Sequence, residues 1–505
     1  MTVQPPPLIA GLLATLPQDP PPRLIETHIS WVILAGGYAY KLKKPLDLGF
    51  LDFSTLDKRR ACCEAEIRLN RRLAPDIYLD VLPVTGREAA PRPGGEGPVL
   101  EWAVWMRAFP ADATLDREPE VTAEQIDAIA DRVAAFHGAI ETAPADSDYG
   151  APDKAVAPVA ANFAHLRALS PPADLLALVD RIEAWSTAEG ARLAPRFAAR
   201  QAGGFVRECH GDLHLGNIAW VDGQPLVFDA IEFNPDLRFI DVVNEVAFLT
   251  MDLRHRGRDD LAWRCLNRYL EYTGDYAGLA ALPYYQVYRA MVRAKVAAIL
   301  AAQHGGDLSA CREYLALADR LAHDRRPVLV LMHGVSGSGK TWQSQRLLES
   351  LGAVRLRSDV ERKRLFGLAA ADSSAAVPGG IYTREAGERT LARLLALARE
   401  LLAAGFTVII DATCLKRDWR DPFAALAEEC RAPWFIAAAE AEPDELRRRV
   451  AQRQSEARDA SEAGLAVLEA QLASLEPFAD HELPHVLRLT PGLEGVLSSI
   501  RAALP

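Results

Sequence analysis

The octapeptide GVSGSGKT, residues 334–341, decides the fold of the C-terminal part of the chain. It follows the apolar run VLVLMH and precedes a helical pattern, which is the context that the motif G-x-x-x-x-G-K-[ST] requires. In this context glycines let backbone N–H groups converge on phosphates, the lysine reaches the outer phosphates, and the hydroxyl binds Mg²⁺. The residues expected to hold a nucleotide are Gly334, Ser336, Gly337, Ser338, Gly339, Lys340 and Thr341, the last also as a metal ligand.

Apolar runs and helical patterns alternate around this motif. The runs lie at about 328–333, 353–357, 406–411 and 433–439. This alternation predicts a parallel sheet built of βαβ units. Asp359 follows the second run, at the end where open α/β sheets bind ligands, and a carboxylate there can accept a proton from an attacking hydroxyl. Asp411 ends the third run and suits a second metal ligand, although either acid could instead cap a helix.

A basic helix follows the last of these runs. Arg449 and Arg453 are four residues apart and therefore share one helical face. Such a pair can cover the charge that develops on a transferred phosphoryl group. A solvated basic surface is the alternative.

Residues 327–500 resemble the AAA-domain P-loop kinases, relatives of polynucleotide kinase, zeta toxin and gluconate kinase. The resemblance implies an α/β P-loop NTPase fold with a parallel, nucleoside-kinase-like sheet. It also implies that Asp359 is the substrate-activating base, Arg362 a contact to the substrate, and Arg449 and Arg453 lid arginines over the nucleotide.

A second constellation lies in the N-terminal part, where HGDLHLGN (210–217) precedes LVFDAIE (226–232). Phosphoryl transfer needs one carboxylate to orient the acceptor hydroxyl and oxygen ligands for Mg²⁺. Asp212 and Asn217 have the spacing of the kinase motif H-R-D-x-x-x-x-N, and Asp229 stands where the aspartate of D-F-G would. The alternative is a metal centre of His210, Asp212 and His214, because alternating residues of an extended segment face one side.

Residues 25–320 resemble the aminoglycoside phosphotransferase family, whose catalytic loop reads H-G-D-x-x-x-x-N. The resemblance implies a two-lobed α+β fold like that of protein kinases, with a small lobe at about 25–110 and a helical large lobe at about 111–321. It implies that Asp212 is catalytic and that Asn217 and Asp229 bind Mg²⁺. One departure is that no G-x-G-x-x-G precedes the strand that should carry the ATP-binding lysine.

The ATP-binding lysine should follow a hairpin centred on Gly36 and Gly37. Lys41 is the preferred candidate, and Lys43 competes because it faces the same side of the strand. Its carboxylate partner should lie on the next helix, where Glu66 is preferred and Glu64 is the alternative. A surface salt bridge would explain either pair without a nucleotide.

Length and charge limit what else the chain can do. Its 505 residues suggest two domains, for which we predict a boundary at 324/325, in the polar segment before VLVLMH. A net charge of −11 ranks nucleic acid below a small molecule as substrate, and no basic leader or long apolar segment points to a membrane, so we expect a cytoplasmic protein. The seven scattered cysteines suggest neither disulfides nor a zinc site, and the sequence does not indicate an oligomeric state.

These observations predict a bifunctional kinase in which each half uses ATP and Mg²⁺ to phosphorylate a hydroxyl group of a small molecule. Two alternatives remain open. One is a regulatory ATP-binding protein with a single active half. The other is a toxin-like or polynucleotide-type kinase in the C-terminal half.

Overall fold

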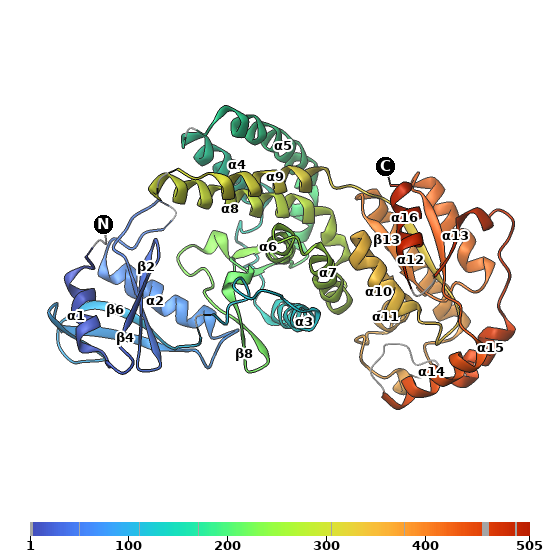
Figure 1. Ribbon diagram of the computed structural model, residues 1–505, viewed down its shortest axis with the longest axis horizontal. Helices are drawn as coiled ribbons and strands as arrows, with labels where there is room; N and C mark the ends of the chain where they lie inside the picture. Colours follow the sequence, from blue (N-terminus) through green and yellow to red (C-terminus); the bar gives the residue numbers. More distant parts are fainter. Residues whose placement is uncertain are drawn as a thin grey trace. The chain divides into compact units, whose positions relative to one another are not determined.

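The protein is described here by a computed structural model (Figure 1). The chain forms two compact units, Met1–His165 with Thr187–Asp252, and Leu166–Ser186 with Leu253–Pro505. The description covers all residues except 1–3, 50, 111, 170, 305, 378, 457–463, 490–491 and 505.

The first unit contains a six-stranded antiparallel sheet of order β1-β2-β3-β6-β4-β5. Its strands are β1 (Arg23–Glu26), β2 (Ser30–Ala35), β3 (Tyr38–Lys43), β4 (Tyr78–Arg87), β5 (Ala90–Pro93) and β6 (Val99–Arg107). The predicted hairpin at Gly36 and Gly37 is confirmed as the β2–β3 connection. β5 was not predicted. It contains two prolines, which are tolerated because β5 is an edge strand.

Two helices cover opposite faces of this sheet. α1 (Pro7–Thr15), which the sequence analysis did not predict, packs against Leu42 and its neighbours. α2 (Leu56–Asn70) packs on the other face, against Ala39. Because side chains alternate along a strand, Lys41 and Lys43 lie on the face of β3 that carries α2.

The rest of the first unit supports the loop at 210–217. β7 (Val206–Glu208) pairs with β10 (Phe239–Asp241), and β8 (Ile218–Val221) forms a hairpin with β9 (Gln224–Val227). α3 (Ala123–Ala139) lies wholly in this unit, whereas α4 (Pro152–Ala168), α5 (Ala173–Ala202) and α6 (Val242–His255) each continue into the second unit. The loop is therefore held between two short strand pairs.

The second unit contains a five-stranded parallel sheet of order β12-β13-β11-β14-β15, coloured yellow to red in Figure 1. The strands are β11 (Leu329–His333), β12 (Ala353–Arg357), β13 (Thr407–Asp411), β14 (Trp434–Ala438) and β15 (Val486–Arg488). The first four confirm the predicted apolar runs and the parallel α/β fold. β15, only three residues long, was not predicted.

Helices cover both faces of this sheet. α10 (Lys340–Leu351) and α16 (Glu494–Ala502) share one apolar core with β11, and α12 (Arg384–Ala403) contacts β12 and β13. The unit also contains α7 (Asp259–Thr273), α8 (Leu282–His304), α9 (Ser309–His323), α11 (Ser358–Leu365), α13 (Arg417–Glu429), α14 (Pro443–Glu456) and α15 (Leu465–Ala473).

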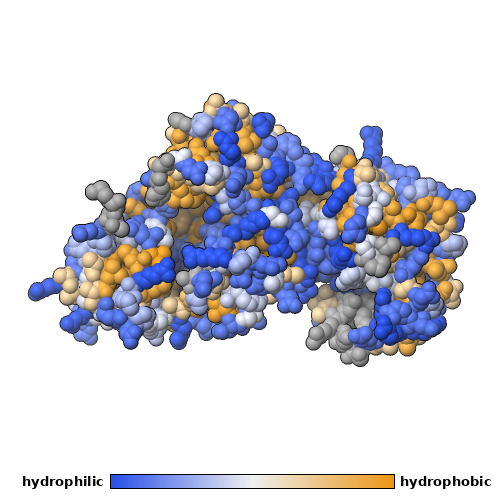
Figure 2. Space-filling view, viewed as in Figure 1, coloured by the Kyte–Doolittle hydropathy of each residue, from blue (hydrophilic) through white to orange (hydrophobic). Residues whose placement is uncertain are grey.

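Hydrophilic residues and small apolar patches alternate on the surface shown in Figure 2. Within the described part of the chain, no helix combines the length and the apolar character needed to cross a membrane. All seven cysteines are free thiols.

Candidate functional site

Lys41 and Lys43 both reach the carboxylate of Glu66 on α2. Lys41 Nζ donates a hydrogen bond to Glu66 Oε1 at 2.9 Å and another to Asp229. Lys43 Nζ donates to Glu66 Oε2 at 2.7 Å and also to Glu232. The two lysines meet one carboxylate because residues two apart in a strand face the same side. Lys41 is thus the lysine that links Glu66 to Asp229.

Glu64, the alternative partner, lies on the outer side of α2. Its side chain is 55% exposed and accepts a hydrogen bond from Arg60 at 2.8 Å, whereas Glu66 is 0% exposed. The structure therefore brings Glu66 to both lysines and leaves Glu64 in a surface ion pair.

Burial opposes ionisation in this cluster, and the ion pairs overcome it at three of the four buried groups. Burial alone would lower the pKa of Lys41, but Asp229 and Glu66 hold it well above the usual value, and Glu232 and Glu66 raise the pKa of Lys43. Burial likewise would raise the pKa of Glu66, which the two lysines nevertheless hold below its ordinary value. At Glu232 burial prevails and raises the pKa.

The loop at 210–217, which the sequence predicts to be catalytic, brings Asp212 and Asn217 together. Asn217 Nδ2 donates to Asp212 Oδ2 at 3.0 Å and to the Asp212 carbonyl at 2.9 Å. The Phe228 N–H donates to the Asn217 carbonyl at 3.0 Å, so the segment carrying Asp229 lies beside the loop. The Asn217 amide oxygen and the Asp229 carboxylate are oxygen ligands of the kind that Mg²⁺ prefers, so these residues fit the metal.

The ring nitrogens of His210 are both engaged within the loop. Nε2 lies 2.8 Å from the Phe228 carbonyl, and Nδ1 accepts the N–H of Asp212 at 3.3 Å. His214 Nδ1 accepts the N–H of Gly216 at 3.1 Å. These contacts disfavour the alternative metal centre of His210, Asp212 and His214, since a ligand needs a free lone pair.

Two acidic side chains of α6 accept hydrogen bonds from the backbone of the loop at 210–217. Glu245 accepts the Gly211 N–H at 2.7 Å, and Asp252 accepts the Leu215 N–H at 3.0 Å. His137 Nε2 lies 2.7 Å from the other oxygen of Glu245. The sequence analysis missed these acids, because a carboxylate that caps buried backbone has no motif of its own.

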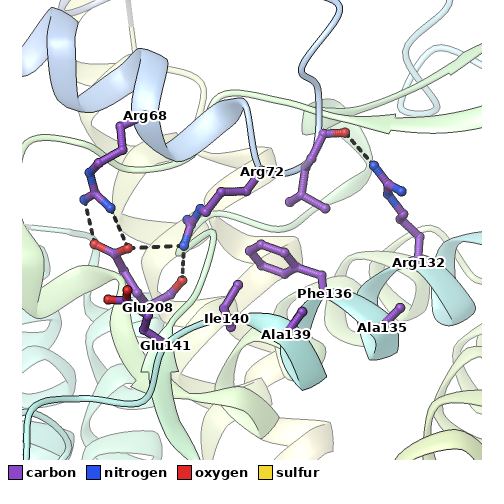
Figure 3. A pocket seen from close by; sticks show the side chains of 10 residues that line it. Arg68, Arg72, Arg132, Ala135, Phe136, Ala139, Ile140, Glu141 and Glu208 are labelled. Carbon is purple, nitrogen blue, oxygen red and sulfur yellow. Dashed lines mark hydrogen bonds and ion pairs between the residues drawn. The ribbon is translucent and has the colours of Figure 1, made fainter.

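A pocket of about 460 Å³ opens between α2 and α3 (Figure 3). Arg68 donates to Glu208 at 2.7 and 2.8 Å, and Arg72 donates to the Glu208 carbonyl at 2.6 Å. Arg132 donates to the Leu73 carbonyl at 3.0 Å. The arginines of this pocket thus have protein partners, and the described residues that line it do not include the predicted catalytic ones.

In the second unit, glycines give the loop at 334–341 its shape. Gly334, Gly337 and Gly339 have φ values of 143°, 83° and 87°. A Cβ on Gly334 would lie 2.4 Å from the Ala439 carbonyl oxygen, so no larger residue fits there. The backbone of this loop therefore depends on glycine.

The polar groups of this loop suit an anion. Lys340 stands at the start of α10, and its Nζ donates to the Val335 carbonyl at 3.0 Å. The buried Ser338 hydroxyl has no hydrogen-bond partner among the described residues. A hydroxyl, an ammonium and a helix N-terminus at one loop fit a phosphate group.

Arg449 of α14 reaches over the same loop. Its Nε donates to Glu445 at 2.6 Å, and its Nη1 donates to the Gly337 carbonyl at 3.4 Å. Arg453 belongs to the same helix, but its side chain lies outside the described residues.

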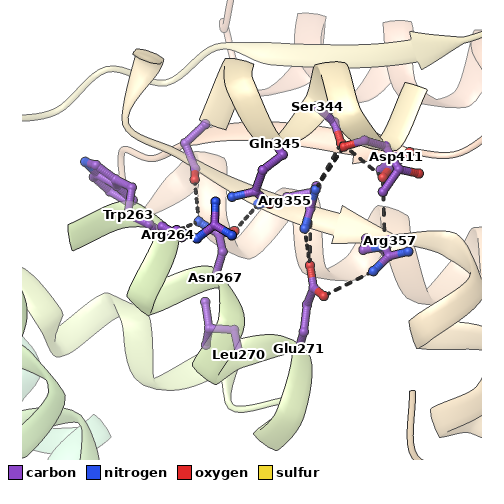
Figure 4. Close-up of polar contacts among 12 residues, drawn as sticks. Trp263, Arg264, Asn267, Leu270, Glu271, Ser344, Gln345, Arg355, Arg357 and Asp411 are labelled. Atoms are coloured by element: carbon purple, nitrogen blue, oxygen red, sulfur yellow. Dashed lines mark hydrogen bonds and ion pairs between the residues drawn. The ribbon is translucent and has the colours of Figure 1, made fainter. Parts of the chain in front are cut away.

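The predicted metal ligand Asp411 ends β13 beside α10 (Figure 4). The Ser344 hydroxyl lies 3.1 Å from Asp411 Oδ2 and 3.0 Å from the Thr341 carbonyl oxygen. Asp411 is thus close to the helix whose first turn contains Thr341, and a carboxylate with a hydroxyl at this place fits Mg²⁺.

Asp359 and Arg362 form an ion pair in α11, directly after β12. Arg362 Nη1 donates to Asp359 Oδ1 at 3.0 Å, and its guanidinium lies over the half-exposed ring of Tyr382, 4.9 Å from the centroid. The buried Nε of Arg362 has no partner among the described residues. A donor so placed suits an anionic or hydroxylated substrate.

A model of the AAA domain family matches residues 329–478. An uncharacterised protein of Mycobacterium tuberculosis is 32% identical over 404 residues, which cover 79% of this chain and 78% of that protein. An uncharacterised protein of Mycobacterium bovis matches to the same extent. The second unit thus contains an AAA-type P-loop domain, and the likeness to the mycobacterial proteins extends well beyond it.

Solved structures of kinases match the two parts separately. A choline/ethanolamine kinase family protein from Mesorhizobium loti is 13% identical and matches 62% of this chain and 93% of its own, with a TM-score of 0.38. A putative kinase from Chloroflexus aurantiacus is 20% identical and matches 36% of this chain and 100% of its own, with a TM-score of 0.30. The kinase-like fold of the N-terminal part is evident from its own sheet, its lysine–glutamate pair and the loop at 210–217.

Proposed function

The chain belongs to the family of these mycobacterial proteins, and from that premise we propose that it is an ATP-dependent phosphotransferase with two active sites. The observation that carries the proposal is the meeting of Lys41, Glu66 and Asp229 next to the hydrogen-bonded pair of Asp212 and Asn217. Residues from four separate segments supply the parts that phosphoryl transfer needs.

In the first site each residue has one role. Lys41, held by Glu66, binds the phosphates of ATP, and Asn217 and Asp229 bind Mg²⁺. Asp212 accepts the proton of the attacking hydroxyl as the γ-phosphoryl group moves to the acceptor oxygen and ADP leaves. Mg²⁺ supplies charge neutralisation on the phosphates when it is bound.

In the second site the loop at 334–341 binds the phosphates and Thr341 with Asp411 binds Mg²⁺. Asp359 is the base, Arg362 contacts the acceptor, and Arg449 and Arg453 cover the nucleotide. Positioning and charge neutralisation supply the catalysis, since phosphoryl transfer asks for little covalent chemistry from the protein.

The acceptor of each site is a hydroxyl group of a small molecule. We propose a functional division at 324/325, with the first site in 1–324 and the second in 325–505. We also propose a cytoplasmic location, where ATP and Mg²⁺ are abundant. A regulatory protein with one active half, and a toxin-like or polynucleotide-type kinase in the second half, are the alternatives.

The proposal is tested by incubating the full-length protein with a metabolite extract and ATP labelled at the γ-phosphate. We expect labelled products that separate into two sets. Asp212→Asn should remove one set and Lys340→Ala the other, and the double variant should label nothing. Arg384→Ala, on a 93% exposed side chain, is the control for Lys340→Ala.

Three outcomes would contradict parts of the proposal. Label that persists unchanged in the double variant would refute both sites. Products unaffected by Asp212→Asn would make the first part regulatory. Label on an added 5′-hydroxyl oligonucleotide, in preference to extract metabolites, would assign the second site to nucleic-acid ends.

A further inference from the structure

Helix α7 packs against the edge strand β12 of the parallel sheet (Figure 4). The Asn267 amide donates to the Ala353 carbonyl at 2.8 Å, and its oxygen accepts the N–H of Arg355 at 2.7 Å. One side chain thus pairs with two backbone groups of an edge strand, as a neighbouring strand would. The Trp263 ring meets Phe406 edge-on, with centroids 6.2 Å apart. α7 is therefore integral to the sheet that carries the second site.

Glu271, one turn further along α7, binds two arginines of β12. Arg355 donates to Glu271 Oε1 at 2.6 and 3.2 Å, and Arg357 donates to Oε2 at 3.3 Å. The Glu271 side chain is 9% exposed. Burial alone would raise the pKa of Glu271, but the two guanidinium groups hold it below its ordinary value. This carboxylate is therefore ionised and shared between two cations.

The same arginines also contact Asp411, the proposed metal ligand of the second site, or its neighbour Ser344. Arg357 Nε lies 3.9 Å from Asp411 Oδ2. Arg355 Nη1 donates to the Ser344 hydroxyl at 3.1 Å, and that hydroxyl is itself 3.1 Å from Asp411 Oδ2. A continuous set of polar contacts thus connects α7 to the proposed metal ligand.

We propose that Glu271 is a positioning residue for the second site, which holds Arg355 and Arg357 away from Asp411 so that this carboxylate stays available to Mg²⁺. This inference rests on the proposed function of that site. The buried cluster contains two cations and two anions. Without Glu271, Arg357 can close the 3.9 Å gap to Asp411, and Arg355 reaches that carboxylate through the Ser344 hydroxyl, so the two guanidinium groups compete with the metal and leave one uncompensated positive charge.

The inference assigns part of the second site to a helix that the sequence places in the first part. Glu271 and Asn267 precede the predicted boundary at 324/325, yet they contact β12 directly. The P-loop part would then depend on residues before 325 for full affinity toward the metal–nucleotide complex.

The test is Glu271→Gln in the full-length protein, read by calorimetric binding of ATP with Mg²⁺ and with EDTA. The second site is the share of binding that Lys340→Ala removes. We expect Mg-ATP affinity at this site to fall about tenfold, because the uncompensated positive charge repels the metal, and metal-free affinity to stay within about twofold. Glu349→Gln is the matched control, because Glu349 binds Arg264 of α7 and none of the β12 arginines in the contacts described.

A second substitution distinguishes an effect of the lost charge from a loss of folding. Glu271→Gln with Arg357→Gln restores neutrality and should recover most of the lost Mg-ATP affinity, and Glu271→Asp should retain it. If Glu271→Gln alone fails to fold, these two variants decide the matter. Unchanged Mg-ATP affinity in folded Glu271→Gln, or no recovery in the double variant, would overturn the inference. A wild-type chain that binds no Mg-ATP at the second site would instead overturn the proposed function.

Discussion

The two proposed active sites differ in the groups that would bind phosphate. The first is built from side-chain charge, in which Lys41 and Lys43 share the carboxylate of Glu66. The second is built from backbone, in which Gly334, Gly337 and Gly339 have positive φ values and Gly334 has no room for a Cβ. A site of paired charges is sensitive to the loss of any one partner, whereas a backbone cradle is sensitive to any added side chain.

Asp212→Asn should give the largest effect and tests whether the first site transfers phosphate at all. We expect transfer at that site to fall about a thousandfold, because an amide cannot accept the hydroxyl proton. Mg-ATP affinity should stay within about threefold, and both are measured on the full-length protein with the acceptor from the extract screen. Asp222→Asn, in the β8–β9 turn, is the control, since asparagine tolerates its φ of 51°. Retention of full transfer would remove Asp212 from the mechanism.

Lys43→Met tests the charge-built character of the first site. It leaves Glu66 and Glu232 with one lysine fewer in a buried environment, so we expect the first unit to lose about 3 kcal/mol of stability. Hydrogen exchange of β3 amides measures this loss. Adding Glu232→Gln should recover about half of it, because the unpaired acid becomes neutral. An equal loss in the single and double variants would show that packing, and not charge, is what Lys43 supplies.

Gly334→Ala tests the backbone-built character of the second site. A Cβ there meets the Ala439 carbonyl oxygen at 2.4 Å, so the loop must move and nucleotide affinity should fall about a hundredfold. Gly257→Ala is the control because Gly257 has a φ of 72° and nothing within 4 Å of the added atom. Calorimetry with Mg-ATP distinguishes the two variants. Equal Mg-ATP affinities of the two variants would mean that the loop accommodates the added Cβ. That result would contradict the view that the second site depends on its glycine backbone.

The sequence predicts features that depend on short local motifs. It does not predict contacts between residues that lie far apart in the chain. The four strands β11 to β14 are visible as apolar runs, and the spacing of Asp212, Asn217 and Asp229 predicts that these residues act together. The ion pair of Lys43 with Glu232 spans 189 positions in the chain, and that of Arg355 with Glu271 spans 84. No local periodicity signals such a pair. From the sequence, Lys43 is therefore an alternative to Lys41 as the ATP-binding lysine. In the structure, Lys43 also pairs with Glu232.

Two short strands were not predicted from the sequence, for a related reason. β5 has two prolines and β15 only three residues, so neither shows the alternation that predicts a strand. Their position in a sheet comes from a partner strand. The same holds for Asn267, whose pairing with β12 depends on a helix more than 80 positions earlier in the chain.

His333 gives the smallest effect and tests the response of the second unit to acid. It ends β11 directly before the phosphate-binding loop, where its ring lies 4.6 Å from that of Phe478 and both nitrogens are buried without a partner among the described residues. Burial, with help from the cations Arg420 and Lys340, lowers its pKa to about 4. The unfolded chain binds a proton near pH 6.5, so the folded state is the poorer proton acceptor.

Stability of the second unit should therefore be fully present above about pH 6.5 and decline as the pH falls toward 4. Between pH 7 and pH 5 the loss from His333 should be about 2 kcal/mol, since each unit of pKa difference is worth about 1.4 kcal/mol. His333→Asn should flatten this dependence in hydrogen exchange of β11 amides, whereas His481→Asn, on a 58% exposed side chain, should not. In the first unit burial also lowers the pKa of His210, so that unit should likewise lose stability as the pH falls below about 6.5, and the contribution of Glu66, whose pKa is depressed, is lost only at lower pH. The His333→Asn variant therefore isolates the acid response of the second unit. An unchanged acid profile of the β11 amides in His333→Asn would remove His333 as the group that titrates there.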